Sequence, residues 1–316
     1  ALYSEGEDEW KKLCERDDID LVFVTTPYYL HAPMAVYAMR QGKHVASEVP
    51  AAGTMEECWQ LVQTAEETRQ HLMMLENYSY MPFHLLTINM ARQGFFGEVV
   101  HGDGAYNTSK MGNNFGRDFY SDMWWLRQYA GRRGNVYPTH GLGPLCQVMD
   151  INRGDRLDFL VSMESNDFAM GKKAAELAGD DPHYAEFAGL EYRGNINTTV
   201  IRTLRGRTIM LQHDGTTPSP HNLIHGIHGT EGAALFDPSP PRLSKGDHKW
   251  VDADEFAALE KQYTPEIQRR MGALARGSGH GGSDMLMVWH LIDCLRNGLP
   301  LDQDVYDAAS WSAIVP

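Results

Sequence analysis

The stretch that decides the fold is Asp20-Leu21-Val22-Phe23-Val24-Thr25-Thr26, a nearly continuous run of apolar and β-branched residues. Such a run is typical of a strand that is buried on both faces, as in a parallel sheet. A helical segment follows, in which Pro33 suits the first helical position and Gly42 marks the end. A strand followed closely by a helix indicates the beginning of a βαβ unit.

Two further strands continue this pattern. They are His44-Val45-Ala46-Ser47 and Leu72-Met73-Met74-Leu75, and between them Thr54 is expected to cap a helix that runs to about Arg69. Strands that alternate with helices through tight links predict a parallel sheet of the doubly wound kind. Residues 1–97 are therefore predicted to form a partial Rossmann-like domain of the α/β class.

After Gly97 the pattern becomes that of an antiparallel sheet, with a hairpin expected at Arg205-Gly206. Strand-like stretches occur at residues 99–106, 159–163, 198–203, 208–212, 223–227 and 233–236. Two helices are expected to close the chain, one over residues 254–276 and one capped by Ser283 that ends at Asn297-Gly298. Residues 98–316 are therefore predicted to form an α+β domain with a large, open, mostly antiparallel sheet.

The composition disfavours two classes of binding partner and a membrane-spanning protein. The 316 residues include 28 basic and 42 acidic side chains, a net charge of -14, which disfavours binding to nucleic acid or to anionic membranes. No apolar run approaches the roughly 20 residues that span a bilayer, so we expect a soluble protein, cytoplasmic or exported. The four cysteines lie far apart, which argues against a zinc cluster or a disulfide framework. A small-molecule or glycan substrate is the expected partner.

Polar and aromatic side chains follow each of the three parallel strands. The three segments are Tyr28-Tyr29-Leu30-His31, Glu48-Val49-Pro50 and Glu76-Asn77-Tyr78. Each residue taken singly is more often a turn or capping residue than a ligand contact. Ligands of open parallel sheets bind beyond the carboxyl ends of the strands, so three such ends at one edge favour a nucleotide pocket.

Two motifs resemble the cofactor domain of the Gfo/Idh/MocA oxidoreductases. They are Thr26-Pro27 with His31-Ala32-Pro33, and Gly42-Lys43-His44-Val45 with Glu48 and Pro50. The resemblance implies an NAD-binding domain followed by a domain with an open, mostly antiparallel sheet. Ordinary members have a catalytic Lys where this chain has Val49, and an Asp four residues before the His that corresponds to His140. Both departures disfavour a simple sugar dehydrogenase.

Longer blocks closely resemble glycoside hydrolase family 109, and the likeness covers nearly the whole chain. The most specific is Tyr137-Pro138-Thr139-His140-Gly141-Leu142-Gly143-Pro144, and Leu211-Gln212-His213-Asp214 is another. The resemblance implies an α-N-acetylgalactosaminidase with a tightly held NAD that is regenerated in each turnover.

The resemblance also implies the site residues by position. The NAD contacts that it implies are Tyr28, Tyr29, Leu30, His31, Glu48, Val49, Asn77 and Tyr137. The sugar-binding and catalytic residues that it implies are Tyr106, Arg127, Tyr137, Pro138, Thr139, His140 and, in place of a family Tyr, His221. A changed hydrogen-bonding partner can alter the choice of sugar, so His221 leaves the sugar open.

The glycine-rich fingerprint of a dinucleotide site and its later acidic residue are absent from the sequence. The chain begins where about the third element of such a domain would begin, and it stops at Val315-Pro316. We therefore expect a chain trimmed at both ends, with an N-terminally incomplete dinucleotide-binding domain.

The polar cluster of Tyr, His and Arg favours oxidation over simple hydrolysis, since no flanking pair of carboxylates is evident in the sequence. NAD would oxidise carbon 3 of the sugar, the group on carbon 1 would be eliminated, water would add, and the ketone would be reduced again. In this hypothesis His140 takes the 3-hydroxyl proton, and Tyr137 transfers a proton at carbon 2 or at the leaving oxygen. The alternatives are a sugar oxidoreductase that consumes NAD(P), and a non-catalytic protein that binds sugar or nucleotide.

Three other features have competing interpretations. His221, His225 and His228 suggest a metal site, but their spacing does not place them on one strand face, so no metal is expected. The segment Gly277-Ser278-Gly279-His280-Gly281-Gly282 lacks the Lys-Ser/Thr of a P-loop and is predicted to be a linker, in which His280 could border a pocket. Trp124-Trp125 either lines a sugar subsite or packs. By analogy, an exposed sheet face predicts a homo-oligomer.

Overall fold

The computed structural model describes residues 2–3 and 5–316, and its chain divides into two units. The first consists of residues 1–85 and 264–316, and the second of residues 86–263. This division differs from the linear boundary expected at residue 97, because the last 53 residues return to the first unit (316 minus 263). Their Leu286 and Leu291 are buried in one core with Ala46 and Met73 of the parallel strands.

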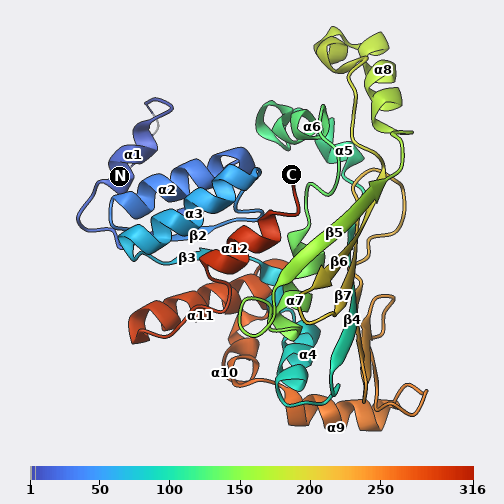
Figure 1. The fold of residues 1–316 in the computed structure, drawn as a ribbon. Helices are drawn as coiled ribbons and strands as arrows, with labels where there is room; N and C mark the ends of the chain where they lie inside the picture. Colours follow the sequence, from blue (N-terminus) through green and yellow to red (C-terminus); the bar gives the residue numbers. More distant parts are fainter. Residues whose placement is uncertain (1, 4) are drawn as a thin grey trace. The chain divides into compact units, whose positions relative to one another are not determined.

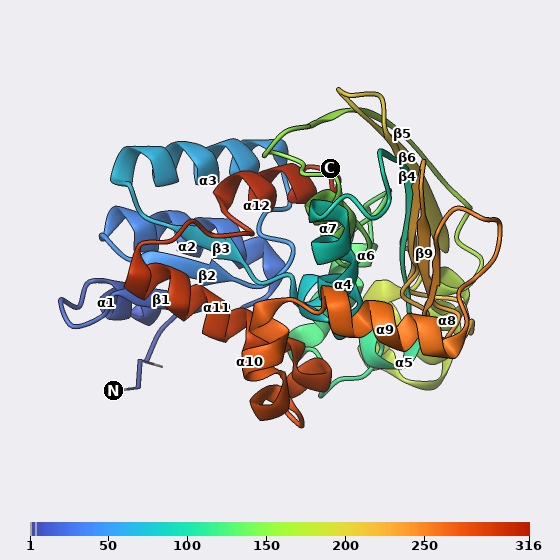
Figure 2. The same ribbon diagram turned by 90° about the horizontal axis from the view of Figure 1, so that it is seen from below.

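The first unit contains a three-stranded parallel sheet, as predicted, and its strand order is β1-β2-β3 (Figures 1 and 2). The strands are β1 (Leu21–Val24), β2 (His44–Ser47) and β3 (Leu72–Met74). Its helices are α1 (Glu9–Cys14), α2 (His31–Arg40), α3 (Met55–Thr68), α10 (Glu266–Ala275), α11 (Ser283–Asn297) and α12 (Val305–Ser312). The predicted cap of α3 is confirmed, because the Thr54 side chain accepts from Glu57 N and the Glu57 carboxylate accepts from Thr54 N.

The C-terminal helices differ from the prediction in three details. The helix expected over residues 254–276 is two helices, α9 (Ala253–Tyr263) and α10, because Pro265 has extended backbone and cannot continue α9. Gly282, not Ser283, is the N-cap of α11, whose C-cap Gly298 has the left-handed backbone that ends a helix, as predicted. Helix α12 was not predicted, although Asp304 caps it in a box with Asp307.

The second unit contains a seven-stranded sheet in the order β10-β9-β8-β4-β7-β6-β5. The strands are β4 (Val99–Asn107), β5 (Leu157–Glu164), β6 (Ile196–Thr203), β7 (Thr208–Asp214), β8 (His225–Gly229), β9 (Ala233–Phe236) and β10 (Arg242–Ser244). Only β4 and β7 pair in parallel, so the prediction of a mostly antiparallel sheet is confirmed. The predicted hairpin joins β6 to β7, with Gly206 at a φ of 87°.

One face of this sheet is covered by α7 (Thr139–Val148), which lies beside β4 in both ribbon views (Figures 1 and 2). The contact depends on two glycines. A Cβ at Gly104 of β4 would overlap the carbonyl oxygen of Gly141, and a Cβ at Gly141 would lie 2.9 Å from Ala105 N. The unit's other helices are α4 (Pro82–Arg92), across which the division between units falls, α5 (Met111–Asn114), α6 (Trp124–Tyr129), α8 (Met170–Asp180) and α9.

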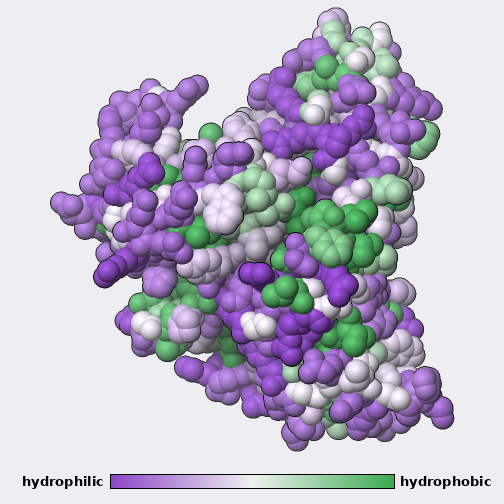
Figure 3. All heavy atoms as spheres, in the orientation of Figure 1, coloured by the Kyte–Doolittle hydropathy of each residue, from purple (hydrophilic) through white to green (hydrophobic). Residues whose placement is uncertain are grey.

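Apolar side chains of the edge strand β5 are exposed. Val161 pairs with Val200 of β6, and Phe159 and Met163 lie two residues to either side of Val161, so these side chains share one sheet face. Val161 is 65% exposed and Met163 76% exposed. In Figure 3 hydrophobic residues gather where Figure 1 draws β5.

Within the part of the chain that the structure describes, no helix is long and apolar enough to cross a bilayer.

Candidate active site

Tyr106 lies near the end of β4, in the second unit, and belongs to a cluster of aromatic rings. In the parallel pairing of β4 with β7 it lies opposite His213. The two rings are stacked, with centroids 6.0 Å apart and an angle of 5° between their planes. His213 Nδ1 lies 2.9 Å from the Tyr106 carbonyl oxygen. Because a carbonyl can only accept, Nδ1 carries the hydrogen.

Tyr137 and His140 complete this cluster from the start of α7. Tyr137 N donates to Asn135 Oδ1 at 3.0 Å, which fixes the turn before the helix. The His140 ring lies 4.8 Å from the rings of both Tyr106 and Tyr137, and these two are 5.4 Å apart. All three side chains are partly exposed, so a ligand can reach them. The structure thus brings together three residues that the sequence placed in the sugar site.

Trp125 packs against the cluster, and the turn before α7 positions two of its rings. Trp125 is buried and packs edge-on against Tyr137 at 5.7 Å, which agrees with the packing interpretation of the Trp124-Trp125 pair. Thr139 is fully buried and begins α7, and Pro138 precedes it as the N-cap. In this structure Pro138 and Thr139 belong to the turn that positions Tyr137 and His140.

His221 and Arg127 lie outside the central three rings. His221 is exposed and forms a hydrogen bond with the Thr108 hydroxyl, and its ring lies edge to face with that of Tyr106, with centroids 6.2 Å apart. Partial burial lowers the pKa of His221. Arg127 lies on α6, where its Nη1 donates to a Glu186 carboxylate oxygen at 2.8 Å. The guanidinium of Arg127 is thus held by a neighbouring acid.

His213 is a buried member of the cluster that is not among the predicted site residues. Burial lowers its pKa well below the usual value, and the positive charge of Arg193 adds to the effect. The ring is therefore neutral, and Nε2 is a buried acceptor without a partner among the described residues. A signal was present, because His213 is polar yet lies in a strand at a position that alternates inward with Ile209 and Leu211.

In the first unit, the segment after β1 is held by His31. Its Nδ1 lies 2.8 Å from Pro50 O and its Nε2 lies 2.7 Å from Thr26 O, so the ring joins the ends of β1 and β2. Burial lowers the pKa of His31. Tyr28 is buried beside it, whereas Tyr29 is exposed and accessible to a ligand. His31 thus organises the loops of the predicted nucleotide site.

The segments after β2 and β3 lie at the same edge, because the three strands are parallel. Glu48 is partly exposed, and a cis peptide bond joins Val49 to Pro50. Asn77 begins a short 3₁₀ helix directly after β3, and its Nδ2 donates to Asp284 Oδ1 at 2.7 Å.

The glycine-rich segment before α11 is joined through His280 to Asp284, which accepts the hydrogen bond from Asn77. His280 Nδ1 lies 2.8 Å from Asp284 Oδ2, and its ring lies 6.5 Å from that of Tyr78. The sequence predicts a linker here, with His280 at a pocket as the alternative. The structure places His280 beside the residues that follow β3.

The three histidines that suggested a metal site do not converge. His225 is buried and hydrogen-bonds the Thr87 hydroxyl, whereas His228 on the same strand is exposed and lies 2.9 Å from an Asp103 oxygen. Among the described residues, no group of three or more His, Cys, Asp or Glu side chains is placed to hold a metal ion.

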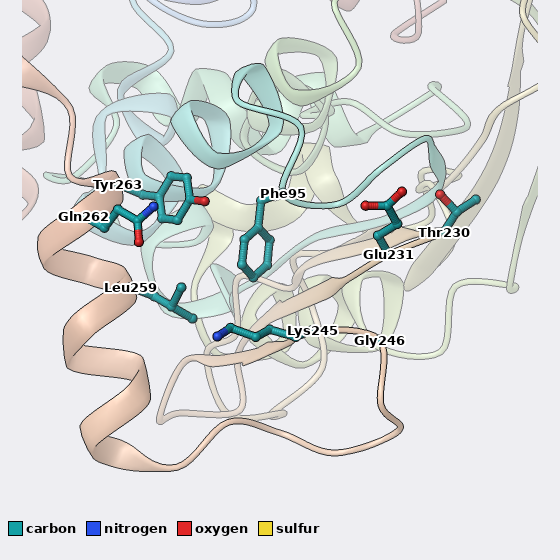
Figure 4. Close-up of a pocket in the computed structure, with 8 residues that line it drawn as sticks. All are labelled: Phe95, Thr230, Glu231, Lys245, Gly246, Leu259, Gln262 and Tyr263. Carbon is teal, nitrogen blue, oxygen red and sulfur yellow. The ribbon is translucent and has the colours of Figure 1, made fainter.

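A separate hollow of about 500 Å³ lies in the second unit, close to the beginning of β4 (Figure 4). Phe95 and Tyr263 meet edge to face at 5.6 Å, and Glu231 and Lys245 supply charges of opposite sign. Its lining includes none of the residues proposed for the sugar or NAD sites. The aromatic cluster at Tyr106 lies toward the other end of β4.

Comparisons with known proteins agree with this architecture. Residues 2–76 match the oxidoreductase family with an NAD-binding Rossmann fold, and residues 80–316 match the C-terminal domain of glycosyl hydrolase 109. The fold and the matches define a protein with an NAD-binding domain of the Gfo/Idh/MocA class joined to a glycosidase domain. The chain belongs to glycosyl hydrolase family 109.

Two relatives illustrate the similarity. An α-N-acetylgalactosaminidase of Bacteroides fragilis is 46% identical over 314 residues, which cover 98% of this chain and 73% of the relative. A glycosyl hydrolase family 109 protein of Shewanella pealeana is 45% identical over 325 residues, covering 99% of this chain and 69% of the relative.

Solved structures share the fold at low identity. A levoglucosan dehydrogenase in complex with NADH and levoglucosan has a TM-score of 0.70 at 17% identity, covering 97% of this chain and 79% of that one. An NAD-binding oxidoreductase from Klebsiella pneumoniae has a TM-score of 0.70 at 15% identity, covering 97% and 78% of the two chains.

Proposed function

We propose that this chain is an NAD-dependent glycosidase that removes terminal α-N-acetylgalactosamine or a closely related sugar. The observation that carries the proposal is the cluster of Tyr106, Tyr137 and His140 at the end of β4. The cluster offers two phenol groups and an imidazole to one ligand, in a chain whose other unit has an NAD-binding fold. The named Bacteroides relative supports N-acetylgalactosamine as the sugar.

The edge of the parallel sheet fits a nucleotide cofactor. Buried Asn77 has a side-chain oxygen without a partner among the described residues, and an acceptor of this kind suits a hydrogen-bond donor of NAD. We propose that the residues that follow β1, β2 and β3 hold NAD, namely Tyr28, Tyr29, Leu30, His31, Glu48, Val49 and Asn77. When bound, NAD supplies hydride transfer from carbon 3 of the sugar and back to it.

The chain's own side chains then move protons and orient the sugar. His140 takes the proton of the 3-hydroxyl group, for which an imidazole is suited near neutral pH. Tyr137 transfers a proton at carbon 2 or at the leaving oxygen. Tyr106 holds the ring of the sugar, and its backbone carbonyl accepts a hydrogen bond from His213 Nδ1. His221 and Arg127 form the outer part of this sugar site.

The test is hydrolysis of a p-nitrophenyl panel of α- and β-linked N-acetylgalactosamine, N-acetylglucosamine, galactose and glucose, with each sugar deuterated at carbon 2. We expect release of nitrophenol from the α-N-acetylgalactosaminide with loss of deuterium to solvent and no net use of NAD. Release with deuterium retained would contradict the oxidation cycle. NAD consumed in proportion to product would instead identify a sugar oxidoreductase. Binding of sugar without turnover would identify a non-catalytic protein.

We also propose that the chain forms a homo-oligomer through the exposed apolar face of β5 and β6. Large exposed apolar patches on soluble proteins mark contact surfaces, and a patch that meets its own copy gives a closed symmetric pair. Phe159, Val161 and Met163 supply this surface on β5, and Val200 continues it on β6.

A further inference from the structure

Asp284 connects two side chains that the sequence places far apart. It lies in the first turn of α11, and its Oδ1 accepts from Asn77 Nδ2 at 2.7 Å across 207 residues of chain. Its other oxygen lies 2.8 Å from Nδ1 of His280. Both carboxylate oxygens are therefore engaged, one on each side, within the first unit.

This arrangement decides which way the Asn77 amide points. An ionised carboxylate only accepts hydrogen bonds, so the NH₂ group of Asn77 must face Asp284 and the amide oxygen must face away. Asn77 is 8% exposed, and its Oδ1 is buried without a partner among the residues that the structure describes. A buried acceptor is costly unless a ligand or a bound water supplies a donor.

We propose that Asp284 is a positioning residue for NAD, because it fixes the Asn77 amide so that Oδ1 accepts a hydrogen bond from the cofactor. The inference rests on the proposed function and deepens it. NAD carries suitable donors in its carboxamide, its ribose hydroxyls and its adenine amine. Without Asp284 the amide of Asn77 is free to rotate by half a turn, and it would then present its NH₂ group to those donors.

A structural role for Asp284 makes a different prediction from a positioning role. If the carboxylate only ties α11 to the end of β3, its loss lowers stability, and any effect on NAD is independent of Asn77. If it acts through Asn77, the two residues are coupled, and removing both weakens NAD binding no more than removing Asn77 alone. A double-mutant cycle on NAD affinity separates the two roles.

The experiment is calorimetric titration of NAD into the full-length protein freed of bound nucleotide. We expect the dissociation constant to rise about ten-fold in Asn77→Ala and by a similar factor in Asp284→Ala, as for a lost hydrogen bond. The double variant should match Asn77→Ala. Thermal unfolding without NAD reports stability separately. Asp293→Ala is the matched control, because Asp293 on the same helix also accepts from an amide, Asn297 Nδ2, at 3.0 Å. It should bind NAD as the wild type does.

Two results would overturn the inference while leaving the proposed function intact. One is unchanged NAD affinity in Asp284→Ala, and the other is a double variant whose loss equals the product of the two single losses. If Asp284→Ala does not fold, Asp284→Leu removes the acceptor while filling the space, and the same two criteria apply. Failure of the full-length wild-type protein to bind NAD would instead remove the proposed function, and the inference with it.

Discussion

At the scale of single residues, the protonation of His225 makes the stability of the fold depend on pH. It is fully buried in β8, and burial lowers its pKa to about 3. In the unfolded chain a histidine takes up its proton near pH 6.5, so between about 6.5 and 3 only the unfolded state is protonated at this position. Its contribution to stability is therefore present above about pH 6.5 and is lost as the pH falls toward 3.

We predict that His225→Gln reduces the acid sensitivity of the fold. A glutamine can keep the hydrogen bond to Thr87 but does not titrate. Below about pH 6.5, the free energy of unfolding of the variant should fall with decreasing pH less steeply than that of the wild type. The two slopes should differ by about 1.4 kcal/mol per pH unit. Urea unfolding over a pH series measures both slopes, and above about pH 7.5 the two curves should run parallel. Equal slopes at acid pH would show that His225 is not buried as a neutral ring.

His140 is the residue whose loss should abolish turnover. We predict that His140→Ala lowers kcat by about 100-fold to 10,000-fold, because the variant lacks the group that we propose takes the hydroxyl proton. NAD binding should persist, since His140 is not among the residues expected to contact NAD. Nitrophenol release measures the first effect and calorimetry the second.

Tyr137→Phe is the matched variant for His140→Ala. It keeps the ring that packs against Trp125 and Tyr106 but removes the hydroxyl. Loss of turnover with normal folding would assign the effect to proton transfer. Hydrolysis at the wild-type rate by His140→Ala would refute the role of the imidazole.

At the scale of elements, the crossing of α7 over β4 positions the aromatic cluster of Tyr106, Tyr137 and His140. Tyr106 lies two residues after Gly104, and His140 lies one residue before Gly141, so the closest approach of helix and strand lies next to the site. Any side chain at Gly104 must push α7 away from the sheet. The close contact of two backbones is therefore a requirement of the site as well as of the fold.

We predict that Gly104→Ala lowers stability by about 1–3 kcal/mol, as expected for an overpacked core, and reduces activity further than stability alone explains. Gly179→Ala is the control, because a Cβ at that helical position meets nothing within 4 Å. It should leave stability unchanged or raise it by up to about 1 kcal/mol. Thermal unfolding and nitrophenol release measure both effects. Equal stability and activity of the two variants would contradict the close contact between β4 and α7.

At the scale of the whole molecule, the exposed face of β5 and β6 predicts the oligomeric state. The wild type should sediment as a homo-oligomer, and Val161→Glu should dissociate it, because a carboxylate would have to lose its water in the contact. Leu274→Glu, on the exposed apolar side chain of α10, should leave the oligomer intact. Sedimentation velocity distinguishes the species. A monomeric wild type would exclude the proposed contact.

The sequence by itself determined the local elements of both sheets. The run at Val22, the cap at Thr54, the turn at Gly206 and the helix end at Gly298 each correspond to an observed feature. These features depend on a few neighbouring residues, so a local pattern is sufficient to predict them. Family-specific blocks also placed Tyr106, Tyr137 and His140 in one candidate site, and the structure brings these three rings together.

Only the tertiary structure decided the long-range contacts. The return of residues 264–316 to the first unit, the meeting of Asn77 with Asp284, and the pairing of His213 with Tyr106 all join distant segments. Contacts of this kind form because apolar faces are buried together and because buried polar groups must find partners. Both requirements are met by the packed molecule as a whole, so the pattern of any one segment does not reveal them.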